Sequence, residues 1–145
     1  MTPNEKKRLI AAALLSRKNA YCPYSDYAVG AALLMESGKI YQGANVENSS
    51  YGLSICAERT AIFNAVSAGE KKVRALCVAA RAPKPCGACR QVLMEFAGPG
   101  CPVLLVDAPL KNTTSQIIEV SAGTLLPMAF FFGNAKAKKN ENKRN

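Results

Sequence analysis

Apolar and polar residues follow helix-like and strand-like spacings in turn along the chain. The opening Thr2-Pro3-Asn4-Glu5 supplies an N-cap, a first-turn proline and a capping box, so a helix is expected from there to about Arg17. Short apolar runs bounded by turn residues are typical of buried strands, and a period near 3.6 is typical of helices. The expected strands are 29–35, 40–46, 73–80, 103–106 and 116–120, and further helices are expected at 56–68, from 86 to the glycines at 98–100, and at 124–129.

The middle of the chain alternates strand, helix, strand, helix, strand. This order predicts an α/β sandwich in which some strands pair in parallel. A chain of 145 residues is long enough for one domain with a core of its own. We therefore expect a single domain over residues 1–133, followed by a tail over residues 134–145.

The tail carries much of the positive charge of the chain. The chain has 19 basic and 10 acidic residues, a net charge of +9, and residues 134–145 hold five basic residues against the single acidic Glu141. This segment has no apolar residue beyond alanine, so it is expected to be disordered. No aromatic residues are interleaved with its charges, and a nucleic-acid partner is therefore not favoured.

Composition also indicates the compartment. No apolar run approaches the ~20 residues of a membrane span, and no apolar segment of the secretory type follows the N-terminus. Six cysteines in a chain with its own core fit a reducing compartment better than a disulfide framework. We expect a cytoplasmic protein with no membrane partner, in which Cys77 packs as a small hydrophobic residue within an apolar run.

Three cysteines stand where they can bind one metal ion. Cys86 and Cys89 are three residues apart at an expected helix start, which places both sulfurs on one face of the first turn. Cys56 opens the other helix, and two helix N-termini pointing at an ion favour thiolates. Three ligands leave one tetrahedral position of a zinc ion open, as in hydrolytic sites. The chain has no histidine, so a purely structural site would need another cysteine, Cys22, Cys77 or Cys101.

Glu58 follows Cys56 by two residues, within reach of a water in the open position. A first ligand, a glutamate two residues later and a downstream Pro-Cys-x-x-Cys, here Pro85–Cys89, form the signature of zinc-dependent deaminases. In that interpretation Glu58 is the proton shuttle between the water, a ring nitrogen and the leaving ammonia. Three thiolates around Zn²⁺ leave a net negative charge, which Arg59 or Arg90 would offset through hydrogen bonds to sulfur.

With these motifs the chain resembles the small cytidine deaminases, the homotetrameric branch with three cysteine ligands. The resemblance runs from about Asn4 to Phe130. It implies that residues 1–133 form a catalytic domain, a three-layer α/β/α sandwich with a mixed five-stranded sheet. The matching segments are Ala20–Ser25, Val29–Leu33, Asn45–Asn48, Ile55–Ile62, Pro85–Val92 and Leu125–Pro127.

The resemblance also implies a reaction and a cofactor. The expected reaction is the hydrolytic deamination of cytidine and 2′-deoxycytidine to uridine and 2′-deoxyuridine in pyrimidine salvage. One Zn²⁺ per subunit would be bound by Cys56, Cys86 and Cys89, with Glu58 as the proton shuttle. The spacing of these residues alone leads to the same assignment.

Substrate contacts are implied by the resemblance only. Asn45 and Glu47 would bind the ribose 3′-hydroxyl, and the backbone of Ala57 would help to position the base. Tyr27 would pack on the pyrimidine, where the family commonly has phenylalanine. The segment before the second motif, residues 80–84, is a few residues shorter than usual, which affects the rim of the pocket. Two further departures are Ala44 for a common cysteine and Asp26 for a common asparagine.

Oligomerisation follows from the resemblance as well. In a homotetramer that shares its active sites, Tyr51 and Phe130 would reach into the pocket of a partner subunit. The aromatic run Phe130–Phe132 would be a large exposed apolar patch on a monomer, so we expect it to be buried between subunits.

Two other functions share the zinc motif. One is the deamination of another cytosine-containing substrate, a nucleic acid or a nucleoside antibiotic. Against it, the Asn45-x-Glu47 pair suits a free ribose hydroxyl, and no groove of aromatic and basic residues is visible. The other is a non-catalytic module that zinc stabilises, with a fourth cysteine closing the shell.

Overall fold

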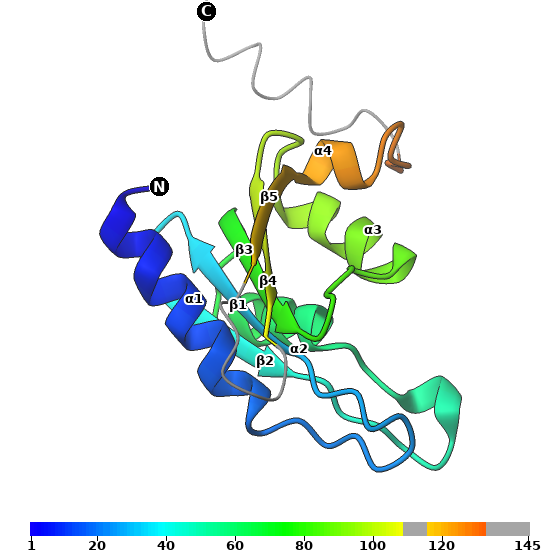
Figure 1. Cartoon of the computed structure of the whole chain (residues 1–145). Helices are drawn as coiled ribbons and strands as arrows, with labels where there is room; N and C mark the ends of the chain where they lie inside the picture. The colour runs from blue at the N-terminus through cyan, green and yellow to red at the C-terminus, as the bar shows by residue number, and fades with distance from the viewer. Residues whose placement is uncertain (109–115, 133–145) are drawn as a thin grey trace, which may run out of the picture.

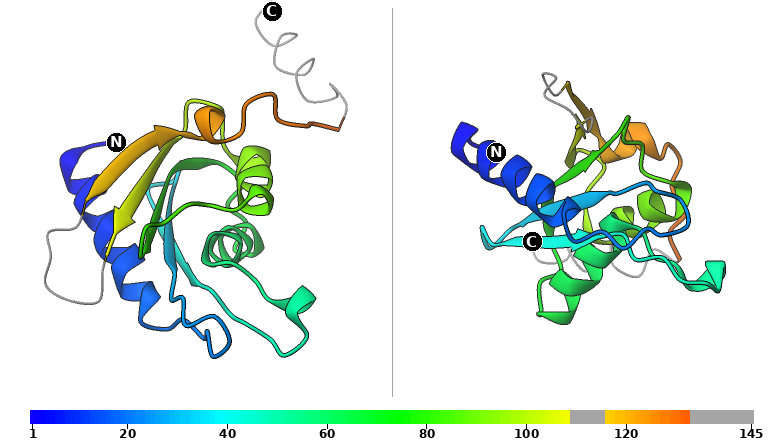
Figure 2. Two further views of the ribbon diagram at one scale, coloured as in Figure 1. Left: turned by 45° about the vertical axis from the view of Figure 1, so that its right-hand side comes forward. Right: turned by 60° about the horizontal axis from the view of Figure 1, so that its bottom comes forward.

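A computed structural model describes residues 1–108 and 116–132 of the chain. Five strands form one sheet in the order β2-β1-β3-β4-β5, and helices cover both of its faces (Figure 1, Figure 2). The helices are α1 (Pro3–Arg17), α2 (Ala57–Ser67), α3 (Gly87–Phe96) and α4 (Ala122–Leu125), with a short 3₁₀ turn η1 (Tyr51–Leu53). The strands are β1 (Gly30–Met35), β2 (Ile40–Ala44), β3 (Val73–Ala80), β4 (Pro102–Asp107) and β5 (Ile117–Ser121).

The sheet mixes parallel and antiparallel pairs. β3 and β4 are parallel, while β1 pairs antiparallel with β2 and β3, and β4 pairs antiparallel with β5. A parallel pair needs a crossover connection, and α3 supplies it. The expected three-layer α/β/α sandwich with a mixed five-stranded sheet is therefore confirmed. None of the helices in the described part of the chain has the length and apolar character of a membrane span.

The face of the sheet under α1 is a buried apolar layer. Leu9 and Ala13 of α1 pack on strand side chains that include Leu34 and Leu104, all of them buried. Each fully buried leucine of this kind contributes about 1.5–3 kcal/mol to folding. Cys77 belongs to this layer, and burial raises the pKa of its thiol to about 12, so the expectation that it packs as a hydrophobic residue is confirmed.

The opposite face packs against α2 and α3. Ile62 and Ala65 of α2 and Leu93 of α3 pack on the strand side chains of this face. Successive side chains of a strand point to opposite faces, so these strand residues alternate in sequence with those that face α1. Gly43 of β2 lets α2 lie directly on the sheet, because a Cβ at this position would overlap the backbone nitrogen of Ala61. The backbone of α2 is thus held at a fixed height above β2.

Most expected elements are present, and the largest differences are at the end of β2 and at both ends of α4. The capping box at Thr2 and Glu5 is formed, with both hydrogen bonds in place. β2 ends at Ala44 instead of 46, because Val46 leaves the sheet and forms bridges to Tyr21 and Ile55. The expected helix at 124–129 is wrong: α4 ends at Leu125.

The start of α4 explains that error. Ser121 is the N-cap, and its hydroxyl accepts a hydrogen bond from the backbone N–H of Thr124. The helix therefore begins two residues earlier than predicted, and Met128 has a left-handed backbone, with φ 54°, that a helix does not allow. The expected tail, residues 134–145, lies outside the described residues.

Candidate active site

Cys56 and Cys86 are the N-cap residues of α2 and α3, and Cys89 lies in the first turn of α3. The three sulfur atoms lie within 4.8 Å of one another. The Sγ of Cys86 is 3.8 Å from that of Cys56 and 3.5 Å from that of Cys89. Tetrahedral zinc with Zn–S bonds of about 2.3 Å separates its sulfur ligands by roughly 3.8 Å. The donor set therefore fits one zinc ion.

The charges around the sulfurs favour a cation. Hydrogen bonds from Cys89 and from Arg59 lower the pKa of the Cys56 thiol to about 5, although partial burial opposes this. Sharing its proton with Cys56 raises the pKa of Cys89, and burial adds to that effect. Three converging thiols cannot all ionise on their own, because the thiolate charges repel one another. A divalent cation removes that obstacle.

The other cysteines lie apart from this cluster. Among the described residues, Cys56, Cys86 and Cys89 are the group with the spacing of a metal site. Cys77 lies on the α1 face of the sheet, whereas the cluster lies at the start of α2 and α3 on the other face. Cys101 is buried at the start of β4, where burial raises its thiol pKa to about 11. A zinc ion bound by these three sulfurs keeps one position open.

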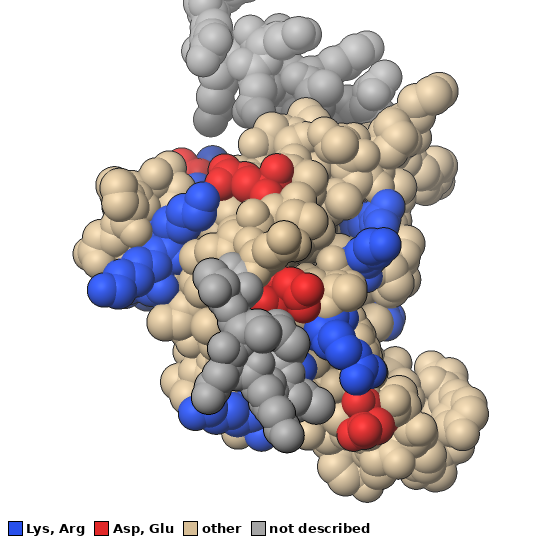
Figure 3. Space-filling view, viewed as in Figure 1, with Lys and Arg blue, Asp and Glu red and all other residues tan. Residues whose placement is uncertain are grey.

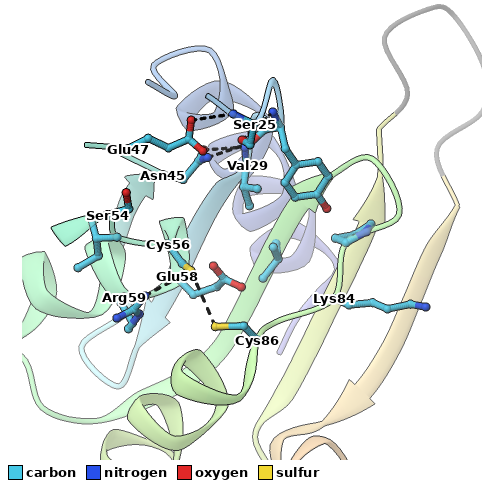
Figure 4. Close-up of a pocket in the computed structure, with 14 residues that line it drawn as sticks. Ser25, Val29, Asn45, Glu47, Ser54, Cys56, Glu58, Arg59, Lys84 and Cys86 are labelled. Atoms are coloured by element: carbon cyan, nitrogen blue, oxygen red, sulfur yellow. Dashed lines mark hydrogen bonds between the residues drawn. The ribbon is translucent and has the colours of Figure 1, made fainter. Parts of the chain in front are cut away.

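Glu58 is buried beside the sulfurs, with 4% of its surface exposed. It lies in the first turn of α2, and Figure 4 shows its carboxylate directed toward Cys56 and Cys86. Burial raises the pKa of this carboxyl, and the negative charge on Cys56 acts in the same direction. A raised pKa makes the carboxylate a stronger base, and once protonated the carboxyl can return the proton to a reacting group.

A pocket of about 420 Å³ opens over the cluster, within the size range of small-molecule sites. Cys56, Glu58 and Arg59 of α2 form one side (Figure 4). The remaining lining residues come from four separate segments: Ser25, Tyr27 and Val29; Asn45 and Glu47; Ser54 and Ile55; and Val78, Pro83, Lys84 and Cys86.

Asn45 and Glu47 lie at the end of the pocket away from the sulfurs (Figure 4). The amide of Asn45 accepts from the N–H of Val29 and donates to the carbonyl of Tyr27, at 2.9 and 2.8 Å. One carboxylate oxygen of Glu47 accepts the backbone N–H groups of Tyr24 and Ser25. Hydrogen bonds from Ser25 and Tyr24 lower the pKa of Glu47, so it is an ionised acceptor in a fixed position.

Tyr27 and Ala57 occupy different places at the pocket. Tyr27 lines it, and its hydroxyl donates to the carbonyl of Arg81 at 2.8 Å. Burial raises the pKa of this phenol, which keeps it protonated and able to donate. Ala57 is the first residue of α2 and is fully buried between the ligand Cys56 and Glu58.

Tyr51 and Phe130 do not line the pocket of their own chain. Tyr51 is 74% exposed in η1 and makes an edge-to-face contact with Tyr24. It borders a second hollow, which shares Ser25, Glu47 and Ser54 with the main pocket. Phe130 is 70% exposed, and its carbonyl accepts a hydrogen bond from Gln91. Both rings are free to contact another molecule.

The two arginines beside the ligands differ in their contacts. Arg59 donates from Nη2 to the Sγ of Cys56 at 3.4 Å, and this bond also raises the pKa of Arg59. Arg90 donates instead to the carbonyls of Pro85 and Leu125, at 2.7 and 2.8 Å. Of the two, Arg59 is thus the one whose hydrogen bond reaches a sulfur; Arg90 connects the start of α3 to the end of α4.

Sequence reasoning missed the pocket residues that carry no motif. Pro83 and Lys84 line the pocket from the short segment after β3, and Val78 lies on β3 itself. Ser54 and Ile55 were visible only as neighbours of Cys56. Pro83 and Lys84 are three and two residues before Cys86, in the short segment 80–84 that was expected to affect the rim of the pocket, and this is the one available signal.

Positive charge is dispersed on one face of the molecule. On the face shown in Figure 3, lysine and arginine side chains lie in separate groups, with acidic and uncharged surface between them. Proteins that follow a nucleic-acid strand present a continuous basic stripe instead. This face therefore does not favour a nucleic-acid partner.

Known proteins share these features. Residues 3–104 match the family model of the cytidine and deoxycytidylate deaminase zinc-binding region. A cytidine deaminase of Sporosarcina psychrophila is 48% identical over 127 residues, which are 86% of this chain and 90% of that protein. A cytidine deaminase of Halalkalibacterium halodurans is 47% identical over 129 residues, which are 87% of this chain and 94% of that protein.

Solved structures have the same fold. The crystal structure of cytidine deaminase from Burkholderia pseudomallei is similar with a TM-score of 0.78 at 44% identity, over 90% of this chain and all of that chain. That of cytidine deaminase from Mycobacterium tuberculosis has a TM-score of 0.73 at 38% identity, over 88% of this chain and 98% of that chain.

Proposed function

Since the chain belongs to the cytidine and deoxycytidylate deaminase family, we propose that it hydrolyses cytidine and 2′-deoxycytidine to uridine and 2′-deoxyuridine, with release of ammonia. One observation carries the proposal. Three sulfurs at zinc-ligand spacing and a buried carboxyl meet at one end of a pocket of nucleoside size. Hydrolytic deamination needs these two elements and a pocket for the base and the sugar.

Cys56, Cys86 and Cys89 would hold the zinc ion, which when bound lowers the pKa of a coordinated water and makes it a nucleophile at neutral pH. Glu58 accepts a proton from the attacking water and passes it to the ring nitrogen N3. It then transfers the second proton to the amino group at carbon 4, which leaves as ammonia. One water is consumed, and the carbon–nitrogen bond is replaced by a carbon–oxygen bond.

Asn45 and Glu47 are proposed to bind the ribose. The ionised Glu47 uses one oxygen for backbone N–H groups, which leaves its other oxygen to accept the 3′-hydroxyl. The amide of Asn45, which lines the pocket, is held by Val29 and Tyr27, and these two bonds leave its second N–H available as a donor. Tyr27 packs on the pyrimidine, and the backbone of Ala57 contacts the base.

Arg59 is proposed to offset the extra negative charge of three thiolates. Its hydrogen bond to Cys56 and its fixed positive charge support this role. Thiolate ligands make a zinc-bound water less acidic than neutral ligands do, and a donor to sulfur reverses part of that effect. Among the described residues, Nε of Arg59 is buried without a partner, so this side chain has a further N–H for an acceptor at the cluster.

The protein is proposed to act as a homotetramer with shared active sites. Tyr51 and Phe130 would complete the pocket of a partner subunit, and their exposure supports this. Leu53, Met128 and Phe132 are also highly exposed, and burial between subunits would remove this apolar surface from water. Light scattering coupled to gel filtration tests the proposal, and a fully active monomer would contradict it.

A place in cytoplasmic pyrimidine salvage is proposed on chemical grounds. The reaction converts free nucleosides and returns uracil nucleosides for further use. All six cysteines are unpaired, and three of them must stay reduced to bind zinc. A reducing compartment keeps them in that state.

The deciding experiment follows the ultraviolet absorbance of cytidine and deoxycytidine with purified protein. We expect turnover of both nucleosides, loss of turnover with a zinc chelator, and recovery when zinc is added back. A single-stranded cytosine-containing oligonucleotide serves as the comparison substrate. Turnover of the oligonucleotide without turnover of the nucleosides would overturn the proposal. So would four sulfur ligands at zinc by X-ray absorption, because they would leave no position for water.

A further inference from the structure

One wall of the pocket is a short connecting segment, Arg81–Pro85, between β3 and α3. Pro83 and Lys84 of this segment line the pocket. In Figure 4, Lys84 and Arg59 lie on opposite sides of the pocket, so the segment lies across the pocket from α2, which carries Glu58 and Arg59. The segment runs directly into the metal ligand Cys86.

Two side chains hold the start of this segment, Arg81 and Ala82, in place, and Arg90 holds its end through the carbonyl of Pro85. The hydroxyl of Tyr27 donates to the carbonyl of Arg81 at 2.8 Å. The carboxylate of Asp107, at the end of β4, accepts the N–H of Ala82 at 2.9 Å. Ala82 has a left-handed backbone, φ 47°, which is uncommon for alanine and persists only where neighbouring contacts impose it.

Tyr27 and Asp107 are themselves joined by one side chain. Arg17, at the end of α1, donates from Nε to the carbonyl of Ala28 at 2.9 Å. Its Nη1 donates to the carbonyl of Ala108. Because Ala28 and Ala108 directly follow Tyr27 and Asp107, the two groups that hold the start of the segment keep a fixed separation.

The orientation of the bound pyrimidine decides which of its edges lies beside the Arg81–Pro85 segment. This step rests on the proposed function. Carbon 4 of the pyrimidine must face the sulfur cluster, and N3 must face Glu58, which delivers its proton. Carbon 5 is the other ring neighbour of carbon 4, so the carbon 5 edge is then directed away from Glu58; Pro83 and Lys84 line the pocket across from α2.

We propose that the Tyr27 hydroxyl is a specificity-determining group, which holds the Arg81–Pro85 segment against the pocket and limits the space beside carbon 5. The enzyme then selects cytidine over cytidines that carry a substituent at carbon 5. Phenylalanine at position 27 keeps the ring against the base but cannot donate to Arg81. The start of the segment would then keep only the hydrogen bond of Ala82 to Asp107, while Arg90 still holds its end.

The test compares Tyr27→Phe with wild type for cytidine and 5-methylcytidine. Loss of one neutral hydrogen bond corresponds to a factor of about 2 to 10, so the ratio of kcat/KM for 5-methylcytidine to that for cytidine should rise by about that much. Asp107→Ala removes the other support at the start of the same segment and should raise the ratio in the same direction. Tyr41→Phe removes a hydroxyl from β2, outside the pocket, and should leave the ratio unchanged.

Hydrogen–deuterium exchange gives a readout that does not depend on turnover. Amides of residues 81–86 should exchange faster in Tyr27→Phe than in wild type, and at the wild-type rate in Tyr41→Phe. An unchanged substrate ratio or unchanged exchange in Tyr27→Phe overturns the inference. If wild type fails to deaminate cytidine, the proposed function is wrong, and the exchange rates still decide whether Tyr27 holds the segment.

Discussion

Helices α2 and α3 begin in the same way and do different work. Each has a cysteine at its N-cap without a side-chain capping bond, and each directs a sulfur at the same point. The first turn of α2 then presents the buried Glu58 and the Arg59 that donates to sulfur. The first turn of α3 presents a second sulfur, Cys89, and an arginine that donates to backbone carbonyls.

The two helix starts therefore differ in the groups that they bring to the cluster. The α3 side supplies two of the three sulfurs and connects them to the scaffold through Arg90. The α2 side supplies one sulfur and the groups that are proposed to exchange protons or adjust charge, Glu58 and Arg59. Changes on the α3 side should therefore affect metal content and stability, and changes on the α2 side should affect turnover with the metal in place.

Cys89→Ser should give the largest effect. It leaves two sulfurs for the ion, so we expect zinc to be lost, activity to fall below detection and the thermal midpoint to fall, because binding of the metal to the folded state stabilises it. Elemental analysis, turnover and calorimetry measure these three quantities. Cys101→Ser, a buried cysteine outside the cluster, is the control and should keep its zinc. Full zinc content in Cys89→Ser would contradict this assignment.

Glu58→Gln should lower kcat by about 10²- to 10⁴-fold, because glutamine fills the same space and cannot exchange a proton. Zinc content and the thermal midpoint should stay near the wild-type values, which separates this variant from Cys89→Ser. Glu95→Gln on the exposed part of α3 is the matched control. Wild-type turnover in Glu58→Gln would remove Glu58 from the mechanism.

Arg59→Met should lower kcat/KM by about 10- to 100-fold, as is usual for a group that hydrogen-bonds a metal ligand. The physical reason is that the Cys56 thiolate loses its donor and its nearby positive charge. Arg59→Lys should recover part of the activity, since it restores the charge. Arg8→Met, at an exposed position of α1, is the control; an equal loss in Arg8→Met would show that the effect is not local.

Arg90→Met should have the smallest effect on turnover. It removes two hydrogen bonds to carbonyls, which we expect to lower the free energy of unfolding by about 1–3 kcal/mol. Turnover per bound zinc should change less than in Arg59→Met, and thermal unfolding followed with zinc analysis measures the difference. A larger loss of kcat in Arg90→Met than in Arg59→Met would reverse the roles given to the two helix starts.

The cluster of three cysteines could be predicted from the sequence because its arrangement is local. Cys86 and Cys89 share one helical turn, and Cys56 and Glu58 share another, so the spacing already indicates their relative directions. The capping box of α1 is local in the same way and was predicted correctly. In contrast, Arg90 is adjacent to Cys89 in sequence, yet its direction depends on the rotation of α3 against α4.

The wall of the pocket could not be predicted, because it depends on contacts between distant segments. Tyr27 and Arg81 are 54 positions apart, and nothing in either neighbourhood indicates that they meet. The predicted bounds of the last helix were wrong for a related reason. Ser121 caps the helix two residues earlier than the apolar pattern indicates, and this start depends on the path of β5 and not on periodicity.

Gly43 has a consequence for the evolution of this site. It lines no part of the pocket, and its only distinguishing property is the absence of a side chain where α2 lies on β2. Any larger residue would push the helix outward and carry Cys56 and Glu58 with it, away from the two sulfurs on α3. In a saturation library selected for growth on cytidine, substitutions at Gly43 should therefore be tolerated as poorly as substitutions at the proposed zinc ligands. A map of mutational tolerance would then mark Gly43 as a functional position, although it has no side chain that could take part in the reaction.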